Sequence, residues 1–524
     1  MGLNIQTYNL PFNRGGFYYD PNYDVVPVQS MISGSRNINL HTGGREKRGG
    51  TAYVYNNFIT GNPRITGLYQ FSKRDGNIYL IIAANNGEIW NGNTSAIATG
   101  LAPAAIYSFE TFNDQVYICN NVNQVKVWTG TGSASNLASP PSDWGTGSPI
   151  QLILHGRGAS QRLWGIGVTG FKQNVYFSAN NSDSFTAAGN GIIRIDSPDP
   201  HGLVGGIEFG DRLFVFSRNE TYIIDDTSLN TSEWGYQQAQ WTGGTASFRT
   251  LVKTPNDLFS MTEDGVIYSV ATAQQYGDYK VADLTKASFI HEWIKDNVDL
   301  SAIRTSCHGV YDPSMNAIKW FIKRIGVTNI DTALVMYLDR DPAEAWTIHD
   351  NIDFNSGYTA SVSCFGKFPG VPSYGVMTGD YSGGIWKLEQ STLNDNGKAY
   401  KSIFRTPPLP FDSPRVRKVY RRTHVTTKEE GNFNLNINIY VDKVFKEQIQ
   451  ASLAGTGSIY GVGVYGTAVY GESGAIIETS FDTRYIGYRI QYEIFNNNAN
   501  EGFFVSRLST DFKPLGLSPS MKNQ

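Results

Sequence analysis

The sequence predicts an all-β protein: a β-propeller of six or seven blades, a C-terminal β-sandwich-like domain and one short inserted helix. The 524-residue chain holds 55 Gly, 30 Tyr and 28 Phe, and only 17% of its residues are charged. Gly-rich turns with many aromatic residues favour β architecture, because flat rings fit pleated faces and glycine supplies positive φ angles. A strand-rich unit also repeats along the chain. A chain of this length is expected to form two or more domains or one large repeat domain.

Residues 1–60 are predicted to form an N-terminal extension and a hairpin that packs on the propeller or on the C-terminal domain. In this region Arg45, Lys47 and Arg48 stand between two Gly-Gly pairs. The segment lacks the Lys-Ser/Thr ending of a Walker loop, and the strand-like TAYVYN follows it where a phosphate loop would have a helix. We therefore expect a hairpin tip with solvated charges. A contact of these three side chains with a DNA phosphate stays open as a second interpretation.

Residues 61–396 are predicted to form the propeller, because a strand–turn–strand unit that ends in Trp or Tyr recurs there. Two clear copies are DGNIYLIIAANNGEIW and NDQVYICNNVNQVKVW. Seven aromatic residues mark the units, with gaps of 38 to 69 residues: Trp90, Trp128, Tyr176, Tyr222, Tyr268, Tyr337 and Trp386. A period of roughly 40 to 50 residues in a strand-rich chain is typical of propeller blades. We expect the marker rings to pack between blades, since one blade cannot bury both of its faces.

The longest gap between marker residues is predicted to hold a helix near 285–298. In LTKASFIHEWIKDNVDL, apolar residues recur at helical spacing, among them Ile290, Trp293 and Ile294. Ser288 is the expected N-cap, because its hydroxyl can accept a hydrogen bond from the first turn. This is the one helix that the sequence predicts.

Residues 397–524 are predicted to form the separate β-sandwich-like domain. A linker with prolines from 407 to 414 precedes several strands of period two. In the strand at 433–442, Leu435, Ile437, Ile439 and Val441 share one face. This alternation indicates a sheet that is buried on one side.

A Tyr-Gly loop at 457–471 interrupts this domain. Tyr460, Tyr465 and Tyr470 are each followed by Gly. A five-residue period matches neither a helix nor a strand, so we expect an extended loop or a bulged ribbon. Exposed rings would favour contact with a partner or another subunit. The alternative, a loop packed on itself, stays open.

The composition limits the compartment and the partners. Forty-three Lys and Arg against 46 Asp and Glu leave a formal charge of −3, which offers no basic surplus for tight nucleic-acid binding. Cys119, Cys307 and Cys364 are too far apart for a disulfide framework or a zinc knuckle. The N-terminus has no signal-peptide pattern, and the longest apolar run, 78–84, is too short to cross a bilayer. We expect synthesis in a cytoplasm and no membrane anchor.

Catalytic patterns are not found in the sequence. It holds no G-x-S-x-G elbow, no H-E-x-x-H and no acidic calcium loop, and its seven histidines are isolated. We therefore expect no enzyme activity, no cofactor and no metal site. A glycosidase would need two facing acids, which a sequence alone does not exclude. A glycan-binding or glycan-cleaving propeller is the alternative.

Two segments resemble recurrent segments of a known family, the tail-tube proteins of short-tailed bacteriophages. These are the nozzle or hub components, also called packaged-DNA stabilisation proteins. SGSRNINLHTGGREKRGGTAYV (33–54) is similar to their N-terminal signature, in which an Asn before a Gly-containing turn is followed by Lys-Arg-x-Gly and a strand. The matching residues are Asn37, Gly43, Lys47, Arg48 and Gly50. GASQRLWGIGVTGFKQNVYFSANNSDSF (158–185) is similar to a second recurrent segment, and the Tyr-Gly loop also fits.

The resemblance implies a virion structural protein with no catalytic residues. Copies would form a homo-oligomeric ring, commonly a hexamer, below the portal and the head–tail adaptor and near tail fibre or needle components. Viral double-stranded DNA would pass through its channel without sequence-specific binding. The protein would be assembled in the host cytoplasm and end in the virion tail. The alternative is a glycan-binding or glycan-cleaving propeller of a phage tail.

The composition suggests how such a channel would treat DNA. Each phosphate that is neutralised adds affinity and therefore friction, so a sliding surface should be neutral to acidic. We expect the basic residues at 415–422 to face subunit or adaptor contacts: Arg415, Arg417, Lys418, Arg421 and Arg422.

Overall fold

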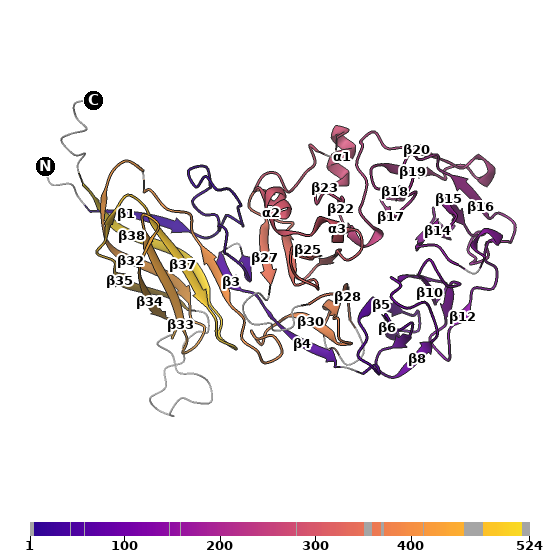
Figure 1. Ribbon diagram of the computed structural model, residues 1–524, viewed down its shortest axis with the longest axis horizontal. Coiled ribbons are helices and arrows are strands. Elements are labelled where there is room, and N and C mark those ends of the chain that lie inside the picture. Colours follow the sequence, from indigo (N-terminus) through magenta and orange to yellow (C-terminus); the bar gives the residue numbers. More distant parts are fainter. Residues whose placement is uncertain are drawn as a thin grey trace.

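The computed structural model describes residues 5–41, 43–56, 58–145, 147–157, 159–278, 280–350, 359–367, 371, 373–411, 413–454 and 475–515. Two parts lie side by side in Figure 1, a β-propeller on the right and a β-sandwich on the left. The first and last described strands, β1 (Gln6–Pro11) and β38 (Phe504–Pro514), both belong to the sandwich.

The propeller has seven blades in the described residues, each an antiparallel sheet. Blade 1 has β5 (Ile65–Ser72), β6 (Ile78–Ala84), β7 (Ile89–Asn91) and β8 (Ser95–Ala98). Blade 2 has β9 (Ser108–Phe112), β10 (Gln115–Cys119), β11 (Lys126–Trp128) and β12 (Ser135–Asn136). Blade 3 has β13 (Gln151–His155), β14 (Arg162–Val168), β15 (Phe171–Phe177) and β16 (Gly191–Arg194). Blade 4 has β17 (Gly205–Phe209), β18 (Arg212–Phe216), β19 (Thr221–Asp225) and β20 (Gly235–Gln238).

The last three blades complete the ring. Blade 5 has β21 (Leu251–Lys253), β22 (Leu258–Met261) and β23 (Ile267–Ser269). Blade 6 has β24 (His308–Asp312), β25 (Ala317–Ile322), β26 (Thr332–Tyr337) and β27 (Trp346–Asp350). Blade 7 has β28 (Val362–Gly366), β29 (Gly375–Gly379), β30 (Ile385–Gln390) and, from the N-terminal region, β4 (Gly50–Tyr55). The first strand of each blade contacts the first strand of the next, and β28 contacts β5.

The aromatic residues that mark the repeat all lie on the third strand of their blades. Trp128, for example, lies on β11 and contacts Phe71 of blade 1 edge-to-face, with ring centroids 6.0 Å apart. Tyr268 on β23 belongs to a buried cluster that includes Phe214 and Phe216 of blade 4. The repeat therefore reflects packing between neighbouring blades, as buried aromatic stripes require.

Blade 5 carries the inserted helices. The predicted helix is α2 (Ile290–Asn297), and it buries Ile290, Trp293 and Ile294. Ser288 does not cap it, because Phe289 occupies the N-cap position in the left-handed conformation and makes no side-chain cap. The structure adds α1 (Val270–Tyr276), which Ser269 caps, and α3 (Leu300–Ile303). The described residues also include three short 3-10 helices: η1 (Ser142–Trp144), η2 (Thr231–Glu233) and η3 (Phe248–Thr250).

The sandwich consists of two sheets that share one core with part of the propeller. The larger sheet has the order β2 (Ile38–His41), β3 (Gly44–Lys47), β38 (Phe504–Pro514), β32 (Lys418–Lys428) and β35 (Ile476–Asp482). In addition, β1 (Gln6–Pro11) pairs with β38 and β36 (Ile486–Gly487) pairs with β32. The smaller sheet has the order β31 (Ser402–Arg405), β37 (Ile490–Asn496), β33 (Asn434–Val441) and β34 (Val444–Ser452). The predicted apolar face of β33 is buried, at 0–2% exposure.

The N-terminal region belongs to both parts. β1, β2 and β3 complete the larger sheet of the sandwich, whereas β4 closes blade 7 by pairing with β30. In Figure 1 this segment runs from the sandwich to the edge of the propeller. The propeller thus uses a strand that comes before residue 61, where the sequence places its start.

Candidate functional site

Arg45, Lys47 and Arg48 are buried, with 0–1% exposure. The hairpin is present, but β3 carries Arg45 and Lys47, and Arg48 follows it directly. The prediction of solvated charges is wrong, because β3 is an inner strand that lies between β2 and β38. No exposed surface of these side chains is left for a DNA phosphate. Buried charges need partners, and all three side chains have them.

Arg48 links the two places where the chain crosses between the sandwich and the propeller. Its Nη1 and Nη2 donate to the two carboxylate oxygens of Asp395 at 2.9 and 2.6 Å. Its Nε donates to Asn37 Oδ1 at 2.9 Å, and the guanidinium lies 3.9 Å from the ring centroid of Tyr400. Arg48 lies between β3 and β4, whereas Asp395 and Tyr400 lie between β30 and β31. The bidentate pair therefore cross-links both crossings.

Lys47 and Arg45 hold the hairpin on the sandwich side. Lys47 Nζ donates to Asn496 Oδ1 at 3.0 Å and to the carbonyl of Asn498 at 2.7 Å. The guanidinium of Arg45 lies between Phe12 and Phe404, 4.5 and 4.8 Å from their centroids. Its Nη2 also donates to the carbonyl of Gln29. These contacts explain how two cations are kept in the interior.

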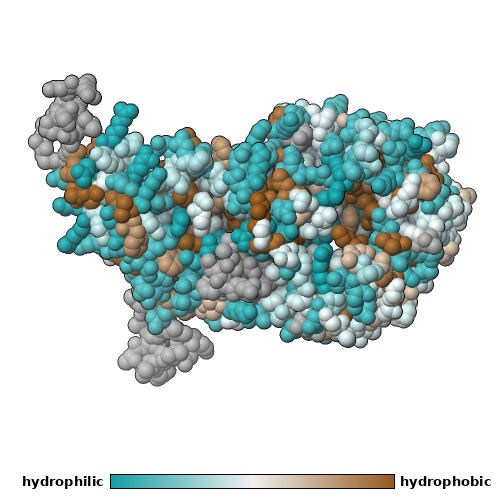
Figure 2. Space-filling view, viewed as in Figure 1, coloured by the Kyte–Doolittle hydropathy of each residue, from teal (hydrophilic) through white to brown (hydrophobic). Residues whose placement is uncertain are grey.

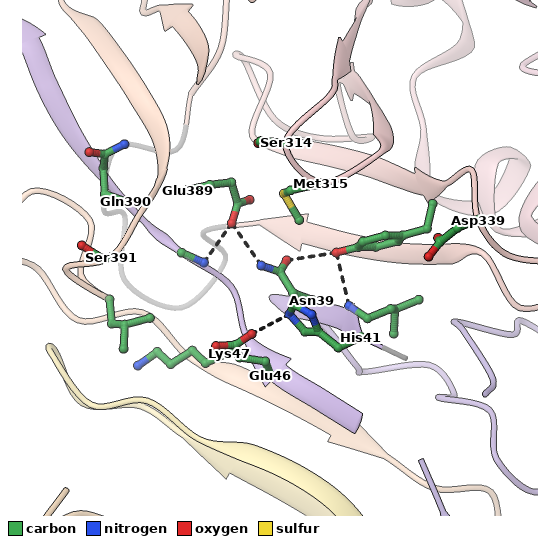
Figure 3. A pocket seen from close by; sticks show the side chains of 14 residues that line it. Asn39, His41, Glu46, Lys47, Ser314, Met315, Asp339, Glu389, Gln390 and Ser391 are labelled. Carbon is green, nitrogen blue, oxygen red and sulfur yellow. Dashed lines mark hydrogen bonds and ion pairs between the residues drawn. The ribbon is translucent and has the colours of Figure 1, made fainter. Parts of the chain in front are cut away.

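Glu389 is the acidic centre on the propeller side (Figure 3). It accepts hydrogen bonds from Lys319 Nζ at 2.7 Å, Asn39 Nδ2 at 3.1 Å and the backbone N–H of Gly49 at 2.9 Å. Lys319 is fully buried on β25. We name this buried network the joint and define it by Asn37, Asn39, Lys47, Arg48, Lys319, Glu389, Asp395 and Tyr400.

The joint perturbs the acid–base equilibria of its members. Burial alone would raise the pKa of Glu389, but the charge and the hydrogen bond of Lys319, together with the neighbouring His349 and Arg48, outweigh burial and lower this pKa to about 2. Burial lowers the pKa of the neighbouring His349 to about 3, so this imidazole is neutral at neutral pH. Burial, with the nearby charge of Arg48, lowers the pKa of Lys47 to about 7. These shifts follow from removal of charges from water in a fixed network.

A cavity of about 550 Å³ opens beside the joint, between the hairpin and blades 6 and 7. Figure 3 shows Glu389 and Asn39 on its wall, and Tyr337 also lines the cavity. Tyr337 Oη donates to Asn39 Oδ1 at 3.3 Å, and His41 and Glu46 pair at 2.5 Å. Asn39, Tyr337 and Glu389 on its wall are hydrogen-bonded to one another, so the cavity borders a structural network.

The other predicted contact residues lie in the sandwich. Arg415, Arg417, Arg421 and Arg422 are exposed, and Arg422 pairs with Asp482 at 3.3 Å. Lys418 departs from the prediction: it is buried, and its Nζ donates to the carbonyls of Ser413 and Val416 at 2.5 and 2.8 Å. Tyr460, Tyr465 and Tyr470 lie outside the described residues.

The cysteine thiols do not have the properties of reactive groups. Burial raises the pKa of each thiol, Cys119, Cys307 and Cys364, to about 12, which disfavours the reactive thiolate. Within the described ranges no group of three or more His, Cys, Asp or Glu could hold a metal ion. In the same part of the chain no helix is long and apolar enough to cross a membrane.

Sequence reasoning did not find the partners of the basic hairpin. Asp395 lies 347 residues from Arg48, and Glu389 lies 350 residues from Asn39. The sequence holds one local sign of this burial: the three basic residues lie close to glycines, and distant backbone packs closely against Gly49 and Gly50. A Cβ on Gly50, for example, would lie 2.1 Å from the carbonyl oxygen of Asn394. Glycine is therefore required here because a side chain would clash with the distant segment that packs against it.

No family model and no curated protein matches the chain. Solved structures that are similar to it include BamB from Moraxella catarrhalis, at 8% identity over 68% of this chain and 95% of that chain, with a TM-score of 0.34. YCF48 from Cyanidioschyzon merolae is similar at 10% identity over 65% and 98% of the two chains, with a TM-score of 0.37. The computationally designed Ika8 protein is similar at 12% identity over 63% and 96%, with a TM-score of 0.32.

Proposed function

We propose that this chain is a structural component of the tail tube of a short-tailed bacteriophage, in the nozzle or hub that retains packaged DNA and conducts it during ejection. One observation carries the proposal: the segment that resembles the family signature, 33–54, is the segment that builds the joint. Asn37, Lys47 and Arg48 of this segment each make buried contacts with distant residues. The resemblance thus concerns residues that hold two domains in one orientation.

A tube wall has to keep its shape while DNA moves past it. The cross-link between Arg48 and Asp395 ties both chain crossings, so the propeller and the sandwich cannot swivel without breaking a buried, bidentate ion pair. Removing one member of such a pair costs about 3–5 kcal/mol. A joint of this kind favours a mechanical role.

The charge of the chain suits passage of DNA. The formal net charge is −3, and the three cations of the hairpin are withdrawn from the surface. Exposed cations would add affinity for each phosphate that they neutralise. We expect DNA to pass without sequence-specific binding.

The assembled form in this proposal is a homo-oligomeric ring, commonly a hexamer in the family that the sequence resembles. Exposed arginines on β32 and just before it are available for contacts with a neighbouring subunit or with the head–tail adaptor: Arg415, Arg417 and Arg421. The solvent exposure of these three arginines supports their assignment as contact residues.

Electron microscopy of the native virion tests the proposal. We expect the chain in a ring below the portal, with DNA density along the bore. A matched pair of variants adds a solution test: charge reversal at Arg415, Arg417 and Arg421 should prevent assembly with the portal–adaptor complex, whereas charge reversal at the exposed Arg194 should not. Location of the chain in a fibre or outside the virion would refute the proposal.

A second candidate function rests on a groove of about 630 Å³ on blade 3. Phe171, 42% exposed, lies in it together with the amides of Gln173 and Asn174. An exposed ring beside amides is a combination that can hold a sugar. Binding on a glycan array, abolished by Phe171→Ala, would favour a glycan-binding propeller over a conduit.

A further inference from the structure

A cluster of basic side chains without a carboxylate lies where four neighbouring inner strands of the propeller begin. Arg64 directly precedes β5, Arg249 lies in η3 before β21, and His308 is the first residue of β24. Ser361 directly precedes β28. The inner strands β21, β24, β28 and β5 contact one another in this order around the ring. The cluster thus brings together residues from blades 5, 6, 7 and 1.

Hydrogen bonds join Arg249, His308 and Ser361, and Ser361 is bonded to the backbone next to Arg64. Arg249 Nη2 donates to the carbonyl of Ser361 at 2.7 Å and to His308 Nδ1 at 3.1 Å. Ser361 Oγ donates to the carbonyl of Ile65, the residue after Arg64, at 2.6 Å. The guanidinium of Arg64 lies 5.4 Å from the ring centroid of Tyr381. Arg64 and Arg249 are both half-buried, so the cluster is within reach of solvent.

The two guanidinium groups lack a counter-ion. Among the described residues, neither Arg64 nor Arg249 lies within ion-pair distance of a carboxylate, and their polar contacts are a carbonyl, an imidazole and an aromatic face. Burial, with the charge of Arg64, lowers the pKa of Arg249 to about 10. Like charges held close together without a counter-ion oppose folding. An anion bound between them would remove this cost.

Hydrogen-bond donors are also left over. Arg64 Nε and His308 Nε2 are buried and have no hydrogen-bond partner in the part of the chain that the structure describes. His308 Nδ1 lies 3.1 Å from Arg249 Nη2 and 3.3 Å from the carbonyl oxygen of Ser306. The guanidinium can only donate and is the nearer partner, so we assign the proton of the neutral imidazole to Nε2. Burial and the two arginines hold the pKa of His308 well below its ordinary value, so this neutral form persists. A buried donor without an acceptor costs free energy that a ligand oxygen would recover.

We propose that Arg64, Arg249 and His308 form a binding site for a small oxyanion of the phosphate or sulfate class. The guanidinium fork of Arg64 can bind two oxygens of a tetrahedral anion, and Arg249, whose Nη2 is already bonded to Ser361 and His308, can donate to another oxygen through Nη1. Phosphate fits such a set of donors better than a halide does. The position at the start of the inner strands lets one anion link blade 1 to blades 5 and 6. This site is independent of the proposed tail function.

Thermal unfolding and calorimetric titration of the full chain test the site, with sodium phosphate, sodium sulfate, sodium acetate and sodium chloride at equal ionic strength. We expect phosphate and sulfate to raise Tm with saturation, and acetate and chloride to have only the common effect of ionic strength. Arg64→Gln and Arg249→Gln should abolish the saturable rise and weaken phosphate binding by about tenfold or more. Arg194→Gln, at an exposed site, should leave it unchanged.

A second readout separates ligand binding from structural damage. In buffer without phosphate, Arg64→Gln should be as stable as the parent or more stable, because it removes the repulsion of Arg249. Equal Tm rises in phosphate and chloride, or a saturable rise that survives in Arg64→Gln, would overturn the proposal. Tighter binding of a duplex oligonucleotide than of phosphate, lost in the same variants, would overturn the assignment to a small anion.

Discussion

Arg48 and Asp395 form an ion pair with no solvent exposure at all. At the residue scale this pair explains why a Gly-framed basic segment does not lie at the surface. The cost of taking two charges out of water is offset only when geometry is good and the remaining donors are satisfied. Here two parallel hydrogen bonds, the bond to Asn37 and the ring of Tyr400 meet that condition.

Loss of Arg48 should therefore be costly. We expect Arg48→Met to lower the free energy of unfolding by about 3–5 kcal/mol, because it leaves the carboxylate of Asp395 buried without its partner. The double variant Arg48→Met/Asp395→Leu should recover part of this loss. Chemical denaturation measures both. The control is Arg194→Met, whose exposed pair with Asp196 should be worth at most about 1 kcal/mol.

Glu389 makes the free energy of unfolding depend on pH in the acidic range. Its pKa is about 2 in the folded protein against 4.5 ordinarily, so its contribution is complete above pH 4.5 and disappears as the pH falls toward 2. We expect Glu389→Gln to lower the free energy of unfolding by about 3 kcal/mol at pH 7, since the buried ammonium of Lys319 loses the negative charge of its closest carboxylate. The difference from the parent should shrink below pH 4.5. A difference that stays constant down to pH 3 would contradict the assignment.

At the element scale, β4 determines how the propeller closes. It is the outer strand of blade 7 but precedes β5 in the sequence, so the first and last parts of the propeller are joined in one sheet. Tyr53 on β4 lies opposite Trp386 on β30, with ring centroids 3.8 Å apart. The backbone hydrogen bonds to β30 and the aromatic pair thus both hold β4 in blade 7.

The aromatic pair offers a test of this closure. We expect Tyr53→Ala to lower the free energy of unfolding by about 2 kcal/mol and to speed amide hydrogen exchange in β30. Tyr53→Phe keeps the ring and should behave as the parent does. Faster exchange spread evenly over all seven blades would show that β4 does not act locally.

At the scale of the whole molecule, the N-terminal region makes two domains into one folding unit. Residues 6–47 supply three strands of the sandwich, and residues 50–55 supply one strand of the propeller. One buried cluster also includes Phe404 and Ile437 of the sandwich together with Trp320 and Trp346 of blade 6. Neither the propeller nor the sandwich has its full set of strands without the N-terminal region.

This sharing predicts cooperative unfolding. We expect a single calorimetric transition for the parent protein, with agreement between calorimetric and van't Hoff enthalpies. Arg48→Met should broaden or split this transition, because it weakens the tie between the two crossings. Two resolved transitions in the parent would contradict the interpretation of the joint as a rigid link.

Local patterns in the sequence were sufficient to predict the class of fold. Apolar residues alternate from Leu435 to Val441 on one strand, and the aromatic markers from Trp90 to Trp386 recur on the third strand of each blade. Such periodicities are local properties, and burial of one face decides them. The hydrogen-bond partners of the basic hairpin were not predictable from the sequence. Arg48 contacts Asp395, and Asn39 contacts Glu389, only in the folded protein, where the propeller is closed. A charge in sequence carries no sign of burial, so solvated charges were the natural expectation for the hairpin. Tertiary structure alone decided this, because the free energy that keeps a cation in the interior comes from residues hundreds of positions away.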